Sequence, residues 1–327
     1  MKPRKKMCVG AILLFAVLFA QSAITAEAAW KPEKPISLII PSTPGGGHDN
    51  NARLVAKYAE KYAGQPINVL NQSAGGGVVG MTNVMTAAPD GLTVGQFSIS
   101  LVSDQYLVSG AKYTQDSFQY IGQIAEDPNC LVVKADGPYG KMSLEEFLAF
   151  ARENPGRIRI GVSGHWTNHD YTRFQLEKVA EVKFQRVSIK GGANIVLGIL
   201  AGDLDAGVPY PSEIKGALDG GELKVLATNG NARSKLLPEV PTFSELGYDV
   251  NLPIWRIWGL PKETPREIVD GWAAILEKTM NDPELIEEHF KVGIGMEFKN
   301  SEDTRKLVEK AHTTYHEIIK EADLIKK

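Results

Sequence analysis

The chain has 327 residues, of which 43% are hydrophobic and 23% are charged, and its formal net charge is −3. This length suits two domains of ordinary size, and the mildly acidic balance argues against a nucleic acid partner. Of the two cysteines, only Cys130 remains once a predicted N-terminal signal is removed, which excludes an internal disulfide in the mature chain.

The first 28 residues have the pattern of a secretory signal peptide. Basic residues at positions 2–6 precede an apolar run at 9–20, and Ala26-Glu27-Ala28 fits the small-x-small cleavage rule. The run holds about twelve residues, which is short for a membrane span, with an uncleaved anchor as the alternative. Cys8 precedes this run, so it is not placed as the lipidated cysteine of a lipoprotein. We therefore expect cleavage after Ala28 and export to the periplasm.

Beyond this segment, short β-branched runs alternate with helical patterns, which is typical of an α/β fold. Strands are predicted at residues 36–40, 67–70, 92–98, 130–134, 157–162, 184–189, 206–208 and 224–227. Helices are predicted after the first glycine-rich turn, at residues 143–153, 169–180 and 302–321, and from residues 191–192 onward. Two capping boxes mark helix starts, Ser143 with Glu146 and Thr264 with Glu267, the second with Pro265 at the first helical position.

The chain holds no flexible Gly/Ser linker, so two lobes would have to be joined by ordered crossovers. We place these crossovers near residues 127–131 and 224–229, which makes the second lobe an insertion within the first. The aromatic stretch at residues 255–258 is interpreted as strand packing in the first lobe, with stacking on a ligand as the alternative.

Four glycine-rich turns lie where a predicted strand gives way to a helix, at residues 41–49, 71–77, 164–167 and 190–193. Glycine lets the backbone approach a ligand, and a helix N-terminus offers unpaired N–H groups and the positive end of a dipole. Each turn is therefore a candidate carboxylate or phosphate site, with a plain strand-to-helix turn as the alternative. The chain has no Gly-Lys-Ser/Thr, and no G-x-G-x-x-G follows its first strand, which disfavours nucleotide-binding folds.

At these turns the sequence resembles the tripartite tricarboxylate transporter receptors, also called Bug-type solute receptors. The order and spacing of the matching residues carry the resemblance. The matches are Lys34-Pro35-Ile36 through Asp49, then Arg53; Asn71 with 75–77; Ala88-Pro89-Asp90-Gly91; Asn154-Pro155-Gly156; Ser163-Gly164 with His169; Lys190-Gly191; Gly202-Asp203 with Asp205; and residues 237–242. The resemblance implies an α/β, two-lobed Venus-flytrap fold in which each lobe is a mostly parallel sheet flanked by helices. Residues 29–128 and 228–327 would form the first lobe, and residues 129–227 the second.

The resemblance also implies a periplasmic receptor that binds a small organic acid between its lobes and delivers it to a two-component membrane permease. We expect a monomer that needs no cofactor and is not an enzyme. The expected ligand-binding residues come from both lobes. They are Thr43, Gly46, Gly47, His48, Asp49, Ser73, Gly76, Ser98, Gly164, His165, Thr167, His169, Gly191, Gly192, Ala193 and Pro209.

The histidines of these turns allow other interpretations. His48 and His165 replace smaller residues of the family, and an anion between them would favour protonation, so that affinity strengthens from about pH 8 to about pH 6; exposure at the cleft rim is the alternative. His165 and His169, four apart, could instead chelate a metal ion together with His48 if they share a helix face. Ser163 with His165 or His169 and Asp170 suggests a hydrolase, but His165 breaks the G-x-S-x-G elbow.

Overall fold

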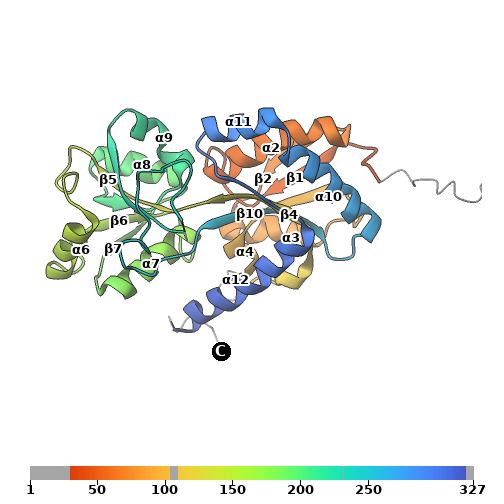
Figure 1. The fold of residues 1–327 in the computed structure, drawn as a ribbon. Helices are drawn as coiled ribbons and strands as arrows, with labels where there is room; N and C mark the ends of the chain where they lie inside the picture. The colour runs from red at the N-terminus through yellow and green to blue at the C-terminus, as the bar shows by residue number, and fades with distance from the viewer. Residues whose placement is uncertain (1–29, 104–109, 231, 322–327) are drawn as a thin grey trace, which may run out of the picture.

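The computed structural model describes residues 30–103, 110–230 and 232–321, and within these ranges the strands form two sheets (Figure 1). The predicted signal peptide, residues 1–28, lies outside the described residues, as does Cys8. Across the part of the chain that the structure describes, no helix has the length and apolar character needed to cross a membrane.

The first sheet has the strand order β11-β4-β10-β3-β1-β2. Its strands are β1 (Ile36–Ile40), β2 (Ile67–Asn71), β3 (Thr93–Ser98), β4 (Phe118–Asp127), β10 (Ile254–Pro261) and β11 (Met296–Lys299). Its helices are α2 (Gly47–Ala63), α3 (Val78–Met85), α4 (Ile99–Ser103), α10 (Arg266–Met280), α11 (Pro283–Lys291) and α12 (Ser301–Glu321). Strand β1 runs parallel to β2 and β3, and its apolar run is almost wholly buried, as expected where helices cover both faces of a sheet.

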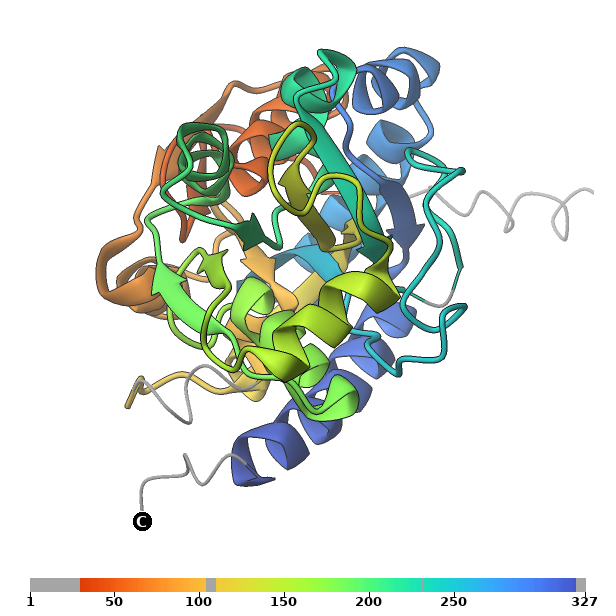
Figure 2. The same ribbon diagram turned by 90° about the vertical axis from the view of Figure 1, so that its left-hand side faces the viewer.

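The second sheet has the strand order β7-β6-β8-β5-β9 and lies to the left in Figure 1 and nearest the viewer in Figure 2. Its strands are β5 (Cys130–Lys134), β6 (Arg159–Val162), β7 (Gln185–Ser188), β8 (Ala206–Gly207) and β9 (Leu223–Thr228). Its helices are α6 (Leu144–Glu153), α7 (Asn168–Ala180), α8 (Gly192–Ala201) and α9 (Pro211–Asp219). We call the two sheets with their helices the first and second lobes.

Both sheets are mixed, where mostly parallel sheets were expected. Strand β10 is antiparallel to β3 and β4, and β5 is antiparallel to β8 and β9. The reason lies in the connections, because a parallel neighbour needs a long crossover within one sheet. Strands β5 and β10 instead enter their sheets from the other lobe. Only two residues separate the end of β4 at Asp127 from the start of β5.

A network of buried side chains holds the two crossovers together. Asn129 and Asn229 exchange hydrogen bonds, with the Asn129 N–H donating to Asn229 Oδ1 at 2.7 Å and the Asn229 N–H donating to the Asn129 carbonyl at 3.0 Å. The Asn229 amide also donates to the Leu252 carbonyl at 2.8 Å, just before the chain enters β10. Phe243 and Val250 pack in the core of the second lobe. The lobe boundaries stay a prediction, and this packing favours a return to the first lobe near Leu252.

Two capping boxes were predicted at helix starts, and the structure contains one of them. The capping box of α6 is present, since Ser143 Oγ accepts from the Glu146 N–H at 3.2 Å and the Glu146 carboxylate accepts from the Ser143 N–H at 2.8 Å. The box predicted at Thr264 is wrong, because Pro265 is the N-cap of α10 and makes no side-chain cap. Thr264 instead closes a turn by donating its N–H to the Pro261 carbonyl.

Candidate functional site

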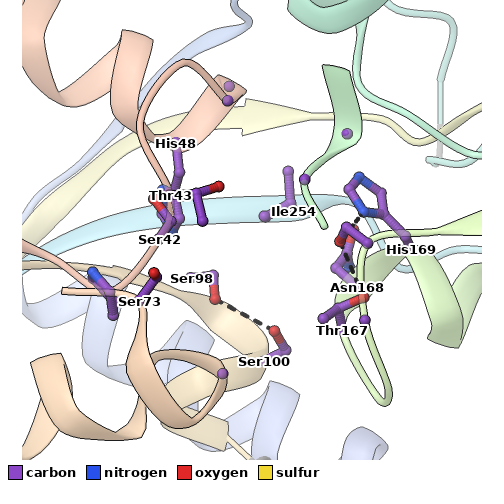
Figure 3. A pocket seen from close by; sticks show the side chains of 18 of the residues that line it. Ser42, Thr43, His48, Ser73, Ser98, Ser100, Thr167, Asn168, His169 and Ile254 are labelled. Carbon is purple, nitrogen blue, oxygen red and sulfur yellow. Dashed lines mark hydrogen bonds between the residues drawn. The ribbon is translucent and has the colours of Figure 1, made fainter. Parts of the chain in front are cut away.

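A cavity of about 380 Å³ lies between the two lobes, and all four glycine-rich turns contribute to its lining. Figure 3 shows Ser42, Thr43, His48, Ser73 and Ser98 of the first lobe on one side, facing Thr167, Asn168 and His169 of the second lobe, with Ile254 between them. The cavity is thus bounded by segments that lie far apart in the sequence.

Most of the residues predicted to bind the ligand line this cavity. They are Thr43, Gly46, Gly47, His48, Ser73, Gly76, Ser98, Gly164, His165, Thr167, His169, Gly191 and Gly192. Asp49, Ala193 and Pro209 are not among the lining residues. Ala193 is exposed, and the carbonyl of Pro209 accepts a backbone hydrogen bond from Cys130 at 2.8 Å.

Asp49 shapes the first turn from within. Its carboxylate accepts from the Gly45 N–H at 2.9 Å and from Asn71 Nδ2 at 2.9 Å, and it pairs with Arg53. Burial acts to raise the pKa of Asp49, but these three donors outweigh it and hold the pKa below its usual value. The side chain is therefore committed to the loop and joins the first turn to the end of β2.

The N-termini of α2 and α8 approach the cavity from opposite lobes. Neither helix has a side-chain N-cap, so their first N–H groups are left for other acceptors. A Cβ atom at Gly192 would lie 1.9 Å from Glu213 Oε2, and one at Gly47 would lie 2.8 Å from Ser212 Oγ. Glycine at position 47 allows the first lobe to come this close to the second, whereas glycine at position 192 makes room for Glu213 within the second lobe.

Glu213 places a carboxyl group at this contact between the lobes. Its Oε2 accepts from the Tyr210 N–H at 3.0 Å, and its Oε1 accepts from the Gly47 N–H of the other lobe at 3.4 Å. Burial raises the pKa of Glu213, and the two backbone donors only partly oppose that effect. Sequence reasoning missed this residue, although Pro211 followed by Glu213 is a helix-start pattern that could have revealed it.

His169 lies on the second-lobe wall and is buried. Its Nδ1 is hydrogen-bonded to Ser163 Oγ, its ring centroid is 4.2 Å from that of Tyr210, and its Nε2 is 3.8 Å from Glu213 Oε2. Burial and then the nearby charge of Arg256 lower the pKa of His169 to about 3. The ring is therefore neutral, and its Nε2 has no hydrogen-bond partner among the described residues.

His48 and His165 lie in different environments, and neither environment favours the protonated ring in the absence of a ligand. Burial, followed by the charge of Arg256, lowers the pKa of His48 to about 3. The side chain of His165 is 60% exposed and lies beside Arg186 and Asp170. Partial burial and then Arg186 lower the pKa of His165 as well. Both rings are neutral at pH 7 before a ligand binds.

The premise of the metal alternative is also wrong. His165 precedes α7, which begins at Asn168, so His165 and His169 do not share a helix face. Within the described ranges, no three His, Cys, Asp or Glu side chains are grouped closely enough to hold a metal ion. Asp170, the acid of the suggested triad, pairs with Arg173 and Arg186 and lies 3.5 Å from His165 Nδ1.

Arg256 is a second residue that sequence reasoning missed. It is fully buried, and its Nη1 pairs with the fully buried carboxylate of Asp127. Its guanidinium lies 5.5 Å from the centroid of the Tyr210 ring, and its Nη2 would lie 3.2 Å from a Cβ at Gly47. The stretch 255–258 is therefore strand packing, as expected, but it also sets a positive charge behind the cavity.

Comparison with known proteins gives a consistent result. The model of the tripartite tricarboxylate transporter family receptor matches residues 51–324. The UPF0065 protein in the gbd 5' region of Cupriavidus necator is 31% identical over 285 residues, covering 85% of this chain and 84% of the relative. A TctC solute-binding protein from Polaromonas is 28% identical, covers 89% of this chain and 99% of its own, and superimposes with a TM-score of 0.72.

Two further solved structures share the fold. A protein of R. palustris with adipate is 23% identical, with a TM-score of 0.82 and coverage of 88% of this chain and 97% of its own. MatC from Rhodopseudomonas palustris with bound malate is 21% identical, with a TM-score of 0.79 and coverage of 90% and 100%. Together with the two sheets, these similarities confirm the predicted two-lobed α/β fold.

Proposed function

Because the chain belongs to the tripartite tricarboxylate transporter receptor family, we propose that it captures a small carboxylate between its two lobes and delivers it to a membrane permease. The observation that carries this proposal is the pair of uncapped helix N-termini, α2 and α8, which face one cavity from opposite lobes. Backbone N–H groups and dipole ends of this kind favour an anion without a positively charged side chain.

The composition of the cavity supports a small polar acid as the ligand. Hydroxyl groups of Ser42, Thr43, Ser73, Ser98 and Ser100 lie along the first-lobe wall. A volume of about 380 Å³ suits a small ligand rather than a peptide. The structurally similar R. palustris proteins are described with adipate and with malate, so these two dicarboxylates are the first ligands to test.

Binding between the lobes would drive closure. A ligand shifts a conformational equilibrium only through a difference in its affinity for the two states. An acid can accept a hydrogen bond from Gly47 of the first lobe and another from Gly192 of the second. It can make both hydrogen bonds at once only when the lobes are close together. The permease would then recognise the closed form, and the predicted signal peptide would place the mature protein in the periplasm.

A thermal-shift screen of carboxylates, with adipate and malate included, tests this proposal. A ligand present at 100 times its Kd adds about 2.7 kcal/mol to the free energy of unfolding, so a true ligand gives a clear rise in Tm. Amines and sugars of similar size serve as controls. If the controls raise the Tm and every carboxylate leaves it unchanged, the proposed ligand class is wrong.

A further inference from the structure

Three residues from three elements form a hydrogen-bonded chain that ends at the cavity. Trp258 of β10 and Gln96 of β3 face each other directly in the antiparallel pairing of their strands, and both are fully buried. The Trp258 indole N–H donates to Gln96 Oε1 at 3.0 Å. Gln96 Nε2 in turn reaches His48, in the first turn of α2. His48 is one of the residues that line the cavity.

The orientation of the Gln96 amide follows from its partners. An indole nitrogen can only donate, so the atom facing Trp258 has to be the carbonyl oxygen of Gln96. At the other end, Gln96 Nε2 lies 2.9 Å from the backbone carbonyl of His48, an acceptor that requires an N–H. Two independent contacts therefore assign the amide, whose orientation is otherwise ambiguous.

The amide then determines the tautomer of His48. Gln96 Nε2 lies 3.2 Å from His48 Nδ1, and an amide nitrogen offers only hydrogens. His48 Nδ1 has to accept, and a neutral imidazole carries its single proton on the other nitrogen. A proton on Nδ1 would set two donors against each other at this distance and would leave the second amide hydrogen without an acceptor.

The proton on Nε2 is left without an acceptor in this structure. His48 Nε2 is buried and has no hydrogen-bond partner in the described parts of the chain. Burial is the largest influence on the ring and, with the positive charge of Arg256, lowers the pKa of His48 to about 3. The negative charge of Asp49 acts in the opposite direction and favours protonation. A buried donor without a partner is costly, and a ligand oxygen would remove that cost.

We propose that Trp258 and Gln96 act as positioning residues that hold His48 as the Nε2–H tautomer, so that His48 donates an uncharged hydrogen bond to an oxygen of the bound acid. This inference rests on the proposed function for the identity of the acceptor, but the tautomer is a property of the free protein. His48 would select for an acceptor oxygen at this point of the ligand and reject an amine or hydroxyl hydrogen directed at it.

The tautomer can be read from nitrogen NMR of protein labelled with 15N-histidine, with the His48 signals assigned by their loss in His48→Leu. In the wild type we expect a protonated Nε2, a bare Nδ1 and no titration between about pH 5 and about pH 8. In Gln96→Glu the new carboxylate accepts from Nδ1, so that nitrogen becomes protonated and the His48 pKa rises. Gln119→Glu adds the same charge to β4, where Gln119 bonds only the Lys262 carbonyl among the contacts described, and serves as the matched control.

Calorimetry with adipate and malate tests the contact with the ligand. His48→Leu should weaken binding about tenfold or more, and His48→Gln, which keeps an N–H near the same place, should retain most of the affinity. Gln96→Glu should make the affinity depend on pH, whereas Gln119→Glu should not. A merely structural role for Gln96 would leave the pH profile unchanged.

Each result decides one part of the inference. A wild-type spectrum with the proton on Nδ1, or a Gln96→Glu spectrum identical to that of the wild type, overturns the proposal that Gln96 sets the tautomer of His48. Equal affinities for wild type and His48→Leu overturn the contact with the acid. If the spectra show the expected tautomer but wild type binds neither acid, the proposed ligand class fails, while the role of Gln96 in setting the tautomer stands.

Discussion

Glu213 is one of the residues at which the two lobes meet, and its carboxyl group is buried beside the N-termini of α2 and α8. A carboxylic acid with a raised pKa in the folded state contributes stability that is fully present below its unfolded pKa and is lost as the pH rises through the folded pKa. The ionised form would also repel an acid bound at the same helix starts. Glu213 therefore couples the site to pH where the histidines do not.

We predict that Glu213→Gln changes the dependence of stability on pH. The quantity compared is the free energy of unfolding of the variant minus that of wild type, and this difference should rise between about pH 4 and about pH 8. Its slope should reach at most about 1.4 kcal/mol per pH unit, in the range where Glu213 is ionised in the unfolded state but not in the folded state. Urea unfolding across this range is the measurement, with Glu146→Gln of the exposed α6 cap as the control. Parallel curves for wild type and Glu213→Gln would show that the buried carboxyl does not titrate abnormally.

The pair formed by Arg256 and Asp127 makes a different prediction, because both side chains are fully buried. Arg256→Met leaves the carboxylate without its partner and should lower the free energy of unfolding by about 3–5 kcal/mol. Adding Asp127→Asn removes the orphaned charge but keeps an acceptor for the Gly295 N–H, so most of the loss should be recovered. Denaturant unfolding of the two variants is the comparison, and a double variant no more stable than the single one contradicts the argument.

At the scale of elements, the start of α8 packs tightly against Glu213 of α9 within the second lobe, and Glu213 in turn contacts Gly47 of the first lobe. Gly192→Ala would set a Cβ 1.9 Å from Glu213 Oε2, so the Glu213 carboxyl group would have to move away from the start of α8. We expect the affinity for a bound carboxylate to fall at least about tenfold and the stability to fall by about 1–3 kcal/mol. Gly216→Ala in α9 is the control, since its Cβ meets nothing within 4 Å and should stabilise the helix by up to about 1 kcal/mol.

The same elements show what could be predicted from the sequence. Glycine-rich turns and capping residues are local signals, so strand β1, the start of α2 and the Ser143 cap follow from neighbouring residues alone. Strands β4 and β11 escaped prediction, and their antiparallel partners lie far away in sequence. Gln96 illustrates the limit for the site, because its role depends on Trp258, a residue 162 positions away.

For the molecule as a whole, the family resemblance was confirmed over most of the chain, and it supplied what local patterns did not: how the two lobes face each other. The four turns each predict an anion site, yet only the arrangement of the two sheets brings them to one cavity. Two crossovers joined by the buried pair of Asn129 and Asn229 connect the lobes without a flexible linker.

This architecture makes closure the final prediction. In the described structure the Gly47 N–H of the first lobe is already 3.4 Å from Glu213 Oε1 of the second, and an acid bridging Gly47 and Gly192 would strengthen the same approach. Small-angle scattering should therefore show a smaller radius of gyration for wild type with saturating adipate or malate, whichever binds, than for the free protein. Gly47→Ala, whose added Cβ would lie 2.8 Å from Ser212 Oγ of the second lobe, should compact less at full occupancy. Compaction of the variant equal to that of wild type would mean that closure does not depend on the contact between the start of α2 and α9.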